Sequence, residues 1–151
     1  MQEENVKQLK IFKDDRGYMF ETLRADDKMF EGKFGQALVS FSKPGKVRAW
    51  HRHKNQTDYT VCVKGNILLL TAEEKTNGKV EIKEYFLGED NMIMLKVPKG
   101  IWHGYTPLGK KEAIVFYIMD QAYDAQNPDE ERKEWNAFGT ECWKNKKLKG
   151  K

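Results

Sequence analysis

The feature that most constrains the fold is a series of short β-type segments that follow one another at nearly regular spacing. Segments rich in β-branched and aromatic residues recur every ~8–12 residues, and turn signals such as Asn77-Gly78 separate them. Many short strands with little helix between them are typical of an all-β sandwich or barrel. The continuous apolar run at residues 67–70 predicts one strand that is covered on both faces.

These patterns predict where the strands lie. We expect strands at residues 5–12, 18–23, 34–41, 47–53, 57–64, 66–71, 79–86, 92–97, 101–105 and 112–119. Residues 127–135 begin with a proline and acidic residues, which predicts a short C-terminal helical segment. No repeat or linker interrupts the pattern, and 151 residues suit one core, so we expect a single domain over residues 1–151.

Charge and composition exclude several classes of partner. The formal net charge is +4, but residues 144–151 carry five lysines, which predicts a flexible basic tail and no nucleic-acid partner. No apolar run approaches the roughly 20 residues of a membrane span, and the N-terminus has no apolar signal sequence, so we expect no membrane association. The two cysteines lie far apart, which favours reduced thiols and a cytoplasmic location.

All three histidines of the chain lie in two segments, residues 45–65 and 98–104. His51 and His53 are two residues apart and therefore lie on the same face of a strand. Asp58 follows five residues later, and His103 comes after a Pro-x-Gly turn. If these segments pair, three imidazoles and a carboxylate converge, which predicts either a metal site or an acid–base site.

A resemblance of two segments to known motifs supports the metal alternative. The spacing of residues 45–65 resembles the first cupin motif, with aspartate where glutamate is usual, and residues 98–103 resemble the core of the second. In metal-binding cupins these positions surround one divalent ion, which implies His51, His53, Asp58 and His103 as ligands and Gln56 as a substitute ligand. Such ligands suit Zn, Fe, Mn or Ni. The chain would then be a metal-binding cupin, either dioxygenase-like or a non-catalytic sugar-binding module.

A narrower resemblance covers roughly residues 14–143. The matching residues are those of the run 15–21, then Gln36, Ser40 and Arg48, the run 98–105, and finally Tyr117, Tyr123, Trp135 and Asn136. On these residues the chain resembles the dTDP-4-dehydrorhamnose 3,5-epimerases. It is most similar to the short epimerase-like members, which also carry a His-x-His pair and the Gln-Thr-Asp run found here at residues 56–58.

The resemblance implies a fold and a reaction. The fold is a double-stranded β-helix, the cupin jelly roll, and the implied assembly is a homodimer that exchanges N-terminal strands. The implied substrate is a nucleoside-diphosphate 4-keto-6-deoxy sugar of sugar-nucleotide or surface-polysaccharide biosynthesis. No cofactor is implied, because a base removes a proton next to the ketone and an acid returns one to the opposite face.

The resemblance also implies a role for individual residues. His51 is implied as the base, which suits an imidazole that titrates near the working pH. Tyr117 is implied as the acid, with Tyr123 and His103 beside the same pocket. The residues implied to hold the nucleotide sugar are Arg16, Glu21, Gln36 and Arg48. An arginine suits a diphosphate because its guanidinium donates two parallel hydrogen bonds.

The chain departs from the family pattern at three points. Asp58 stands where the family has a lysine assigned to the enolate, and an anion beside a developing anion is unfavourable. Leu69 stands where the family has an aspartate, and the carboxylate partner of the base comes from a C-terminal stretch that is missing here. The sequence therefore leaves open epimerisation at C3 or C5 and 3,4-isomerisation of the keto sugar.

Overall fold

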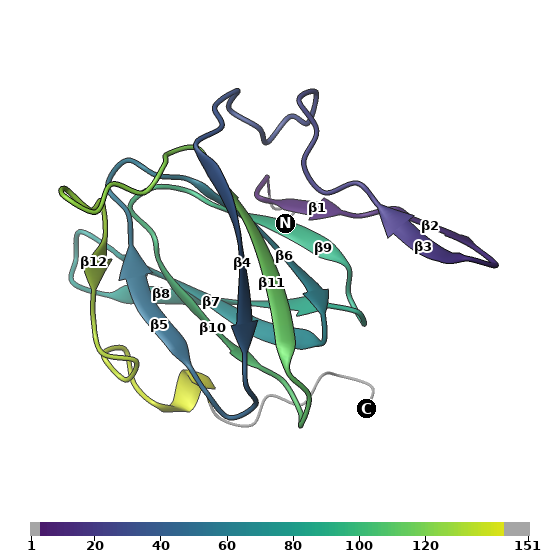
Figure 1. Ribbon diagram of the computed structural model, residues 1–151. Helices are drawn as coiled ribbons and strands as arrows, with labels where there is room; N and C mark the ends of the chain where they lie inside the picture. Colours follow the sequence, from purple (N-terminus) through teal and green to yellow (C-terminus); the bar gives the residue numbers. More distant parts are fainter. Residues whose placement is uncertain (1–3, 144–151) are drawn as a thin grey trace.

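Antiparallel β-strands make up nearly all the regular structure of the computed structural model, which describes residues 4–143 (Figure 1). The strands are β1 (Val6–Gln8), β2 (Ile11–Asp14), β3 (Gly17–Phe20), β4 (Gln36–Ser42), β5 (Arg48–Arg52), β6 (Asp58–Lys64), β7 (Asn66–Glu74), β8 (Val80–Gly88), β9 (Ile93–Val97), β10 (Trp102–Pro107), β11 (Ala113–Met119) and β12 (Glu131–Arg132). Between residues 4 and 143 the one helical element is a 3-10 turn, η1 (Glu141–Trp143). This part of the chain holds no helix of the length and hydrophobicity needed to cross a bilayer.

The strands form two five-stranded sheets and a separate hairpin. One sheet has the order β1-β9-β6-β11-β4, the other has the order β12-β5-β10-β7-β8, and β2 pairs with β3. From β4 onwards the chain passes repeatedly between the two sheets, with β7 and β8 as the exception that stays in one sheet. This is the arrangement of a jelly roll, which confirms the predicted all-β fold class.

Strand β7 is covered on both faces, as its continuous apolar run predicts. Ile67 and Leu69 belong to the core cluster between the sheets, whereas Leu68 and Leu70 pack on the outer face against Trp50. All four aliphatic side chains are at most 2% exposed, and each such burial contributes about 2 kcal/mol to folding. The outer face of this sheet is therefore closed by packing, and a ligand site must open elsewhere.

Residues 127–135 are not helical, contrary to the prediction from their proline and acidic residues. Glu131–Arg132 form β12 on the edge of β5, and Trp50 and Lys133 exchange two backbone hydrogen bonds of 3.0 Å. The free edge of β5 satisfies backbone groups that a short, marginally stable helix would leave exposed. The predicted helical segment is thus reduced to η1, and the predicted basic tail at 144–151 lies outside the described residues.

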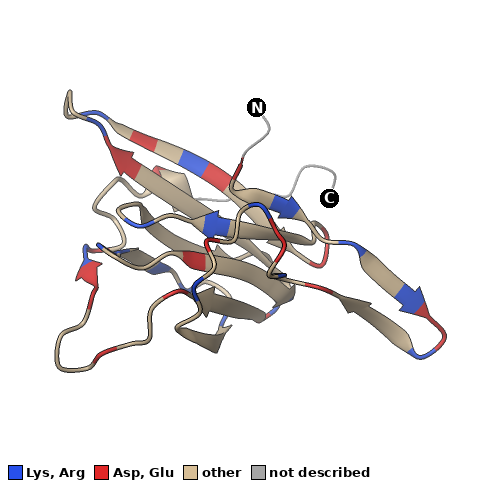
Figure 2. Ribbon diagram, turned by 90° about the horizontal axis from the view of Figure 1, so that it is seen from above, with Lys and Arg blue, Asp and Glu red and all other residues tan. Residues whose placement is uncertain are grey.

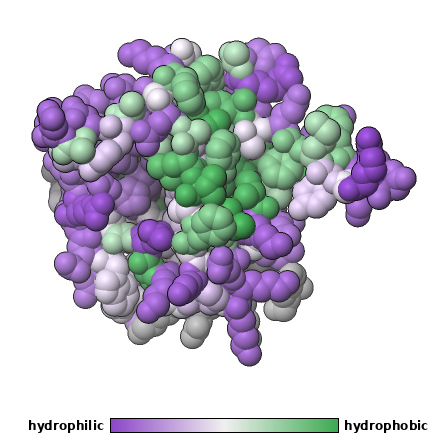
Figure 3. Space-filling model, in the orientation of Figure 1, coloured by the Kyte–Doolittle hydropathy of each residue, from purple (hydrophilic) through white to green (hydrophobic). Residues whose placement is uncertain are grey.

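The N-terminal region does not form one edge strand. It divides after Gln8 into β1, which joins a sheet, and β2, which pairs with β3 in a hairpin that projects from the sandwich with charged residues at its tip (Figure 2). Met19 of the hairpin is 67% exposed, and Phe41 on the edge strand β4 is 60% exposed. Figure 3 shows a broad apolar area on this side of the molecule. Exposed apolar side chains beside a free strand edge are typical of an association surface.

Candidate active site

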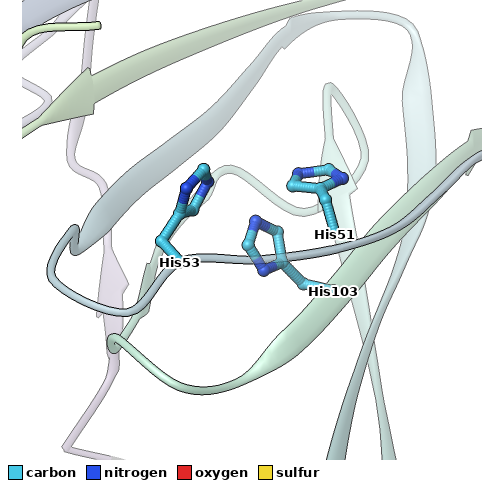
Figure 4. Close-up of side chains that lie close together, drawn as sticks. All are labelled: His51, His53 and His103. Carbon is cyan, nitrogen blue, oxygen red and sulfur yellow. The ribbon is translucent and has the colours of Figure 1, made fainter. Parts of the chain in front are cut away.

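The three histidines meet because β5 and β10 are neighbours in one sheet. His51 and His103 are direct partners in the antiparallel register, and their ring centroids lie 4.1 Å apart. The ring of His53, just beyond the end of β5, lies 5.9 Å from that of His51 and 5.8 Å from that of His103 (Figure 4). One nitrogen from each ring lies within 4.8 Å of the other two. The structure thus brings together the side chains that the sequence spacing predicts to converge.

Gly104 permits this close approach of β5 and β10. A Cβ atom on residue 104 would lie 2.3 Å from the Cβ of Ala49 and 2.6 Å from the carbonyl oxygen of Arg48. These distances are far below van der Waals contact, so any larger residue would separate the two strands. The regular pairing also shifts between His103 and Tyr105, beside this glycine.

Asp58 reaches the histidines from the opposite sheet. Its Oδ2 lies 3.3 Å from Nε2 of His103 and 3.7 Å from Nε2 of His53, while its Oδ1 accepts a 2.7 Å hydrogen bond from Gln56. Burial opposes ionisation of this carboxyl, but the two histidines and Gln56 outweigh it and hold the pKa of Asp58 below its ordinary value. A buried negative charge therefore stands beside the imidazoles.

His51 has the properties of a neutral proton acceptor. Burial, followed by the influence of His103 and His53, lowers its pKa well below the ordinary value, although Asp58 acts in the opposite direction. A neutral imidazole keeps one nitrogen lone pair available. That lone pair can accept a proton from a substrate or bind a metal ion.

Backbone carbonyls fix the orientation of the other two rings. Nδ1 of His103 lies 3.0 Å from the carbonyl oxygen of Ile101, and Nδ1 of His53 lies 2.5 Å from that of Asp129. The Asp129 carboxylate in turn accepts hydrogen bonds of 2.8–3.1 Å from the backbone N–H groups of residues 54–56. Asp129 was not predicted from the sequence, since it lies 76 residues from His53 in a segment that was expected to be helical.

A cavity of about 740 Å³ opens beside this cluster. Its lining includes His51 and His53 at one side and Tyr117 and Gln36 from the opposite sheet, and it continues along the segment that precedes β12. His103 is buried at 4% exposure and is not part of the lining. The predicted base and the predicted acid thus share one cavity, which is large enough for part of a nucleotide sugar.

Tyr117 is a protonated phenol in a hydrogen-bonded neighbourhood. Burial, with a further contribution from Tyr105, raises its pKa well above the ordinary value, although Ser40 opposes this. The Tyr105 hydroxyl is held by Ser40 and Ser42 at 2.7 Å each. Tyr105 was not singled out from the sequence as a site residue, because no local pattern distinguishes it from a core tyrosine.

The remaining predicted residues divide between the cavity and the projecting hairpin. Arg48 lines the cavity and donates from Nε to Ser42 at 2.7 Å, and the Gln36 side-chain oxygen accepts a 2.6 Å bond from the Tyr123 backbone, at the edge of the same cavity. Arg16 and Glu21 do not line it.

Arg16, in the turn of the hairpin, and Glu21, directly after β3, each pair with a residue close in sequence. Arg16 bonds Asp14 at 2.6 Å and Glu21 contacts Arg24 at 3.2 Å. Within one chain Arg16 and Glu21 thus lie apart from this cavity, because the hairpin projects away from the sandwich, and their role in holding the nucleotide sugar stays a prediction.

Comparison with known proteins places this geometry in a family. The family model described as dTDP-4-dehydrorhamnose 3,5-epimerase matches residues 2–143. The spore coat polysaccharide biosynthesis protein SpsL of Bacillus subtilis is 38% identical over 133 residues, which cover 87% of each chain. The probable low-salt glycan biosynthesis epimerase Agl13 of Haloferax volcanii is 32% identical over 130 residues, covering 84% of this chain and 83% of that protein.

Solved structures agree with this placement. The dTDP-4-dehydrorhamnose 3,5-epimerase of Bacillus anthracis, solved with TDP and PPi bound, is 29% identical and matches with a TM-score of 0.73 over 87% of this chain and 78% of that chain. A dTDP sugar isomerase of Desulfovibrio desulfuricans matches with a TM-score of 0.80 at 24% identity, over 87% of this chain and 84% of that chain, and shows the same fold. The chain belongs to the dTDP-4-dehydrorhamnose 3,5-epimerase family.

Proposed function

We propose that this protein catalyses epimerisation or isomerisation of a nucleoside-diphosphate 4-keto-6-deoxy sugar in cytoplasmic sugar-nucleotide or surface-polysaccharide biosynthesis. The observation that carries the proposal is the cavity shared by a neutral imidazole, His51, and a protonated phenol, Tyr117. One group can accept a proton and the other can donate one. Family membership and the TDP-bound relative support a nucleotide sugar as the substrate.

The reaction is a redox-neutral exchange of protons and requires no cofactor. The C4 ketone acidifies the C–H bonds at C3 and C5, so His51 removes one of these protons and the electron pair moves to the ketone oxygen as an enolate. The Tyr117 O–H then protonates the same carbon from the opposite face, and the ketone re-forms. The negative charge of Asp58 stabilises the imidazolium form of His51, since it raises the pKa of the His51 ring. Arg48 and Gln36 line the same cavity and bind the nucleotide sugar.

Deuterium exchange tests the proposal directly. The protein is incubated in D₂O with a dTDP-4-keto-6-deoxy sugar, and proton NMR follows the signals at C3 and C5. Loss of either signal at a rate proportional to the protein concentration is the expected result. If both signals persist at enzyme concentrations comparable with that of the substrate, the protein does not enolise this class of sugar.

Tyr117→Phe is expected to separate the two halves of the reaction. Without the phenolic proton the enolate is formed but is not protonated from the opposite face, so epimerised product falls by about 10²-fold or more. Deuterium exchange continues at the carbon from which His51 removes a proton, because His51 and the face of the sugar that it contacts are unchanged. Product chromatography and NMR exchange, measured on the same samples, report the two effects.

The parallel variant Tyr123→Phe decides which hydroxyl is the acid. Tyr123 is 64% exposed and borders the same cavity. A large loss of epimerised product in Tyr123→Phe, with none in Tyr117→Phe, would transfer the role of acid to Tyr123.

We also propose that two copies form a homodimer in which the hairpin of one chain packs on the other. Apolar side chains exposed on the hairpin and on β4 support this, and Arg16 and Glu21 would then reach the cavity of the second copy. Phe41→Glu is expected to shift the mass measured by light scattering from that of two chains towards that of one. Val80→Glu, on the other sheet and 39% exposed, is the matched control and should leave the mass unchanged. A wild-type protein that is monomeric at high concentration would contradict the assembly.

A further inference from the structure

The proposed reaction creates a negative charge that the residue at the family's enolate position cannot stabilise. Removal of a proton next to the ketone turns the C4 oxygen of the sugar into an enolate oxygen. Asp58 stands where the family pattern has a lysine, and it is a buried carboxylate that lines the cavity. A positively charged hydrogen-bond donor for this oxygen must therefore come from another part of the chain.

Three cationic side chains line the cavity: Arg48, Arg132 and Lys133. Arg48 is held at the β4 side of the cavity. Its Nε donates to Ser42 at 2.7 Å, and its Nη2 donates to the backbone carbonyl oxygen of Phe41 at 3.2 Å. These bonds direct the Arg48 guanidinium towards β4, which leaves Arg132 and Lys133 as candidates.

Lys133 turns its ammonium group away from the cavity. Its Nζ lies 2.6 Å from a carboxylate oxygen of Glu74 and 4.8 Å from the ring centroid of Trp102. Trp102 belongs to the apolar cluster on the outer face of the sheet. Because successive side chains of a strand point to opposite faces, the side chain of Arg132 is directed inwards.

Arg132 lies directly beside the base. It is the cross-strand partner of His51 in the antiparallel pairing of β12 with β5 (Figure 1), and both residues line the cavity. Direct partners extend on the same face of a sheet with their Cβ atoms about 5 Å apart. Burial and the two neighbouring histidines are the larger causes of the lowered pKa of His51, and the positive charge of Arg132 adds to them.

The Arg132 guanidinium keeps one donor group available. Its Nε and Nη2 donate to the same oxygen of Glu130, at 3.1 and 2.9 Å. Nη1, which carries two N–H donors, has no hydrogen-bond partner among residues 4–143, and the side chain is 78% exposed. Glu130 thus holds one edge of the guanidinium and leaves the other edge for a substrate oxygen.

We propose that Arg132 is a further catalytic residue, whose guanidinium donates hydrogen bonds to the C4 oxygen of the keto sugar while His51 removes the neighbouring proton. This inference rests on the proposed function. The electrons of the broken C–H bond form a C–C double bond, and the ketone electron pair moves to the C4 oxygen, where the N–H bonds strengthen. The guanidinium stays protonated throughout. Protonation of the carbon then restores the ketone.

Arg132→Gln tests this role, because it removes the charge and keeps a polar side chain of similar shape. Deuterium exchange at C3 or C5 of a dTDP-4-keto-6-deoxy sugar, at saturating substrate, is expected to fall by about 10²- to 10³-fold, the usual effect of losing one donor to a developing oxyanion. The affinity for dTDP, measured by calorimetry, is expected to be unchanged, since Arg132 contacts the sugar ketone and not the nucleotide. The thermal midpoint is expected to stay close to that of the wild type, because the side chain is exposed.

Three controls separate the charge from other effects. Arg132→Lys keeps a cation and is expected to recover part of the lost exchange. Added guanidinium chloride, kept far below denaturing concentrations, is expected to increase exchange by Arg132→Ala and not by the wild type. Lys83→Gln removes a positive charge from β8, at the opposite edge of the same sheet and outside the cavity lining, and is expected to keep the wild-type exchange rate.

The outcomes distinguish this inference from the function on which it rests. Wild-type exchange by a folded Arg132→Gln would overturn the inference and leave the proposed function standing. A loss of dTDP affinity with unchanged exchange at saturating substrate would also overturn it, because Arg132 would then bind the diphosphate. A wild-type protein that shows no exchange would remove the proposed function and this inference together.

Discussion

His51→Ala is expected to slow deuterium exchange at C3 and C5 of a 4-keto-6-deoxy sugar by about 10²- to 10⁴-fold, the usual contribution of a positioned general base. The imidazole is the group that accepts the proton in the first step, so exchange and epimerised product fall together. This distinguishes the variant from Tyr117→Phe, in which exchange survives. NMR exchange rates at saturating substrate, with wild type and variant at equal concentration, measure the effect.

Two controls define the result. The thermal midpoint of His51→Ala shows whether the fold is intact, because removing one ring from a buried cluster also changes packing. His53→Ala removes the same ring type two residues away, and its exchange rate is expected to fall far less, since His53 does not take the proton. Wild-type exchange in a folded His51→Ala would show that another group is the base.

The strand pattern was predictable because the polarity of the side chains on each face of a strand matches the environment of that face. The run at 67–70 is apolar throughout because both of its faces are covered, one by the opposite sheet and one by Trp50. The pairing of β12 with β5 was not predictable in the same way. Glu131–Arg132 is a two-residue strand of charged residues, and its partner lies about 80 positions away on an edge that local sequence does not reveal.

The site shows the same division between local and distant information. The period of two at residues 51–53 and the turn before β10 are local signals, and they predicted the positions of the three histidines. The pairing of β5 with β10 then brings His51 and His103 together. The support of His53 by Asp129 depends on two segments that meet only in the folded chain. The position of Arg16 depends on where the hairpin leaves the sandwich, and nothing in residues 5–12 marks the break between β1 and β2.

Gly104→Ala is expected to cause a large loss of stability together with a loss of activity. The added Cβ would lie 2.3 Å from the Cβ of Ala49 and 2.6 Å from the carbonyl oxygen of Arg48, which belongs to the backbone of β5 and cannot rotate away. The two strands must separate at the residue next to His103, so the His51–His103 pair opens as well. Overpacking of this kind costs about 3 kcal/mol of unfolding free energy. Denaturant titration measures this loss, and deuterium exchange measures the activity.

Gly78→Ala is the matched control for this effect, because it makes the same chemical change without the collision. Gly78 lies in the turn between β7 and β8 with a φ of +80°, and an added Cβ there would have no atom within 4 Å. Its cost is the backbone strain of a left-handed alanine, about 1 kcal/mol, and exchange should be unchanged because no residue of this turn lines the cavity. Equal stability losses in the two variants would show that β5 and β10 accommodate a side chain at residue 104. The close strand contact would then not be what holds the two imidazoles together.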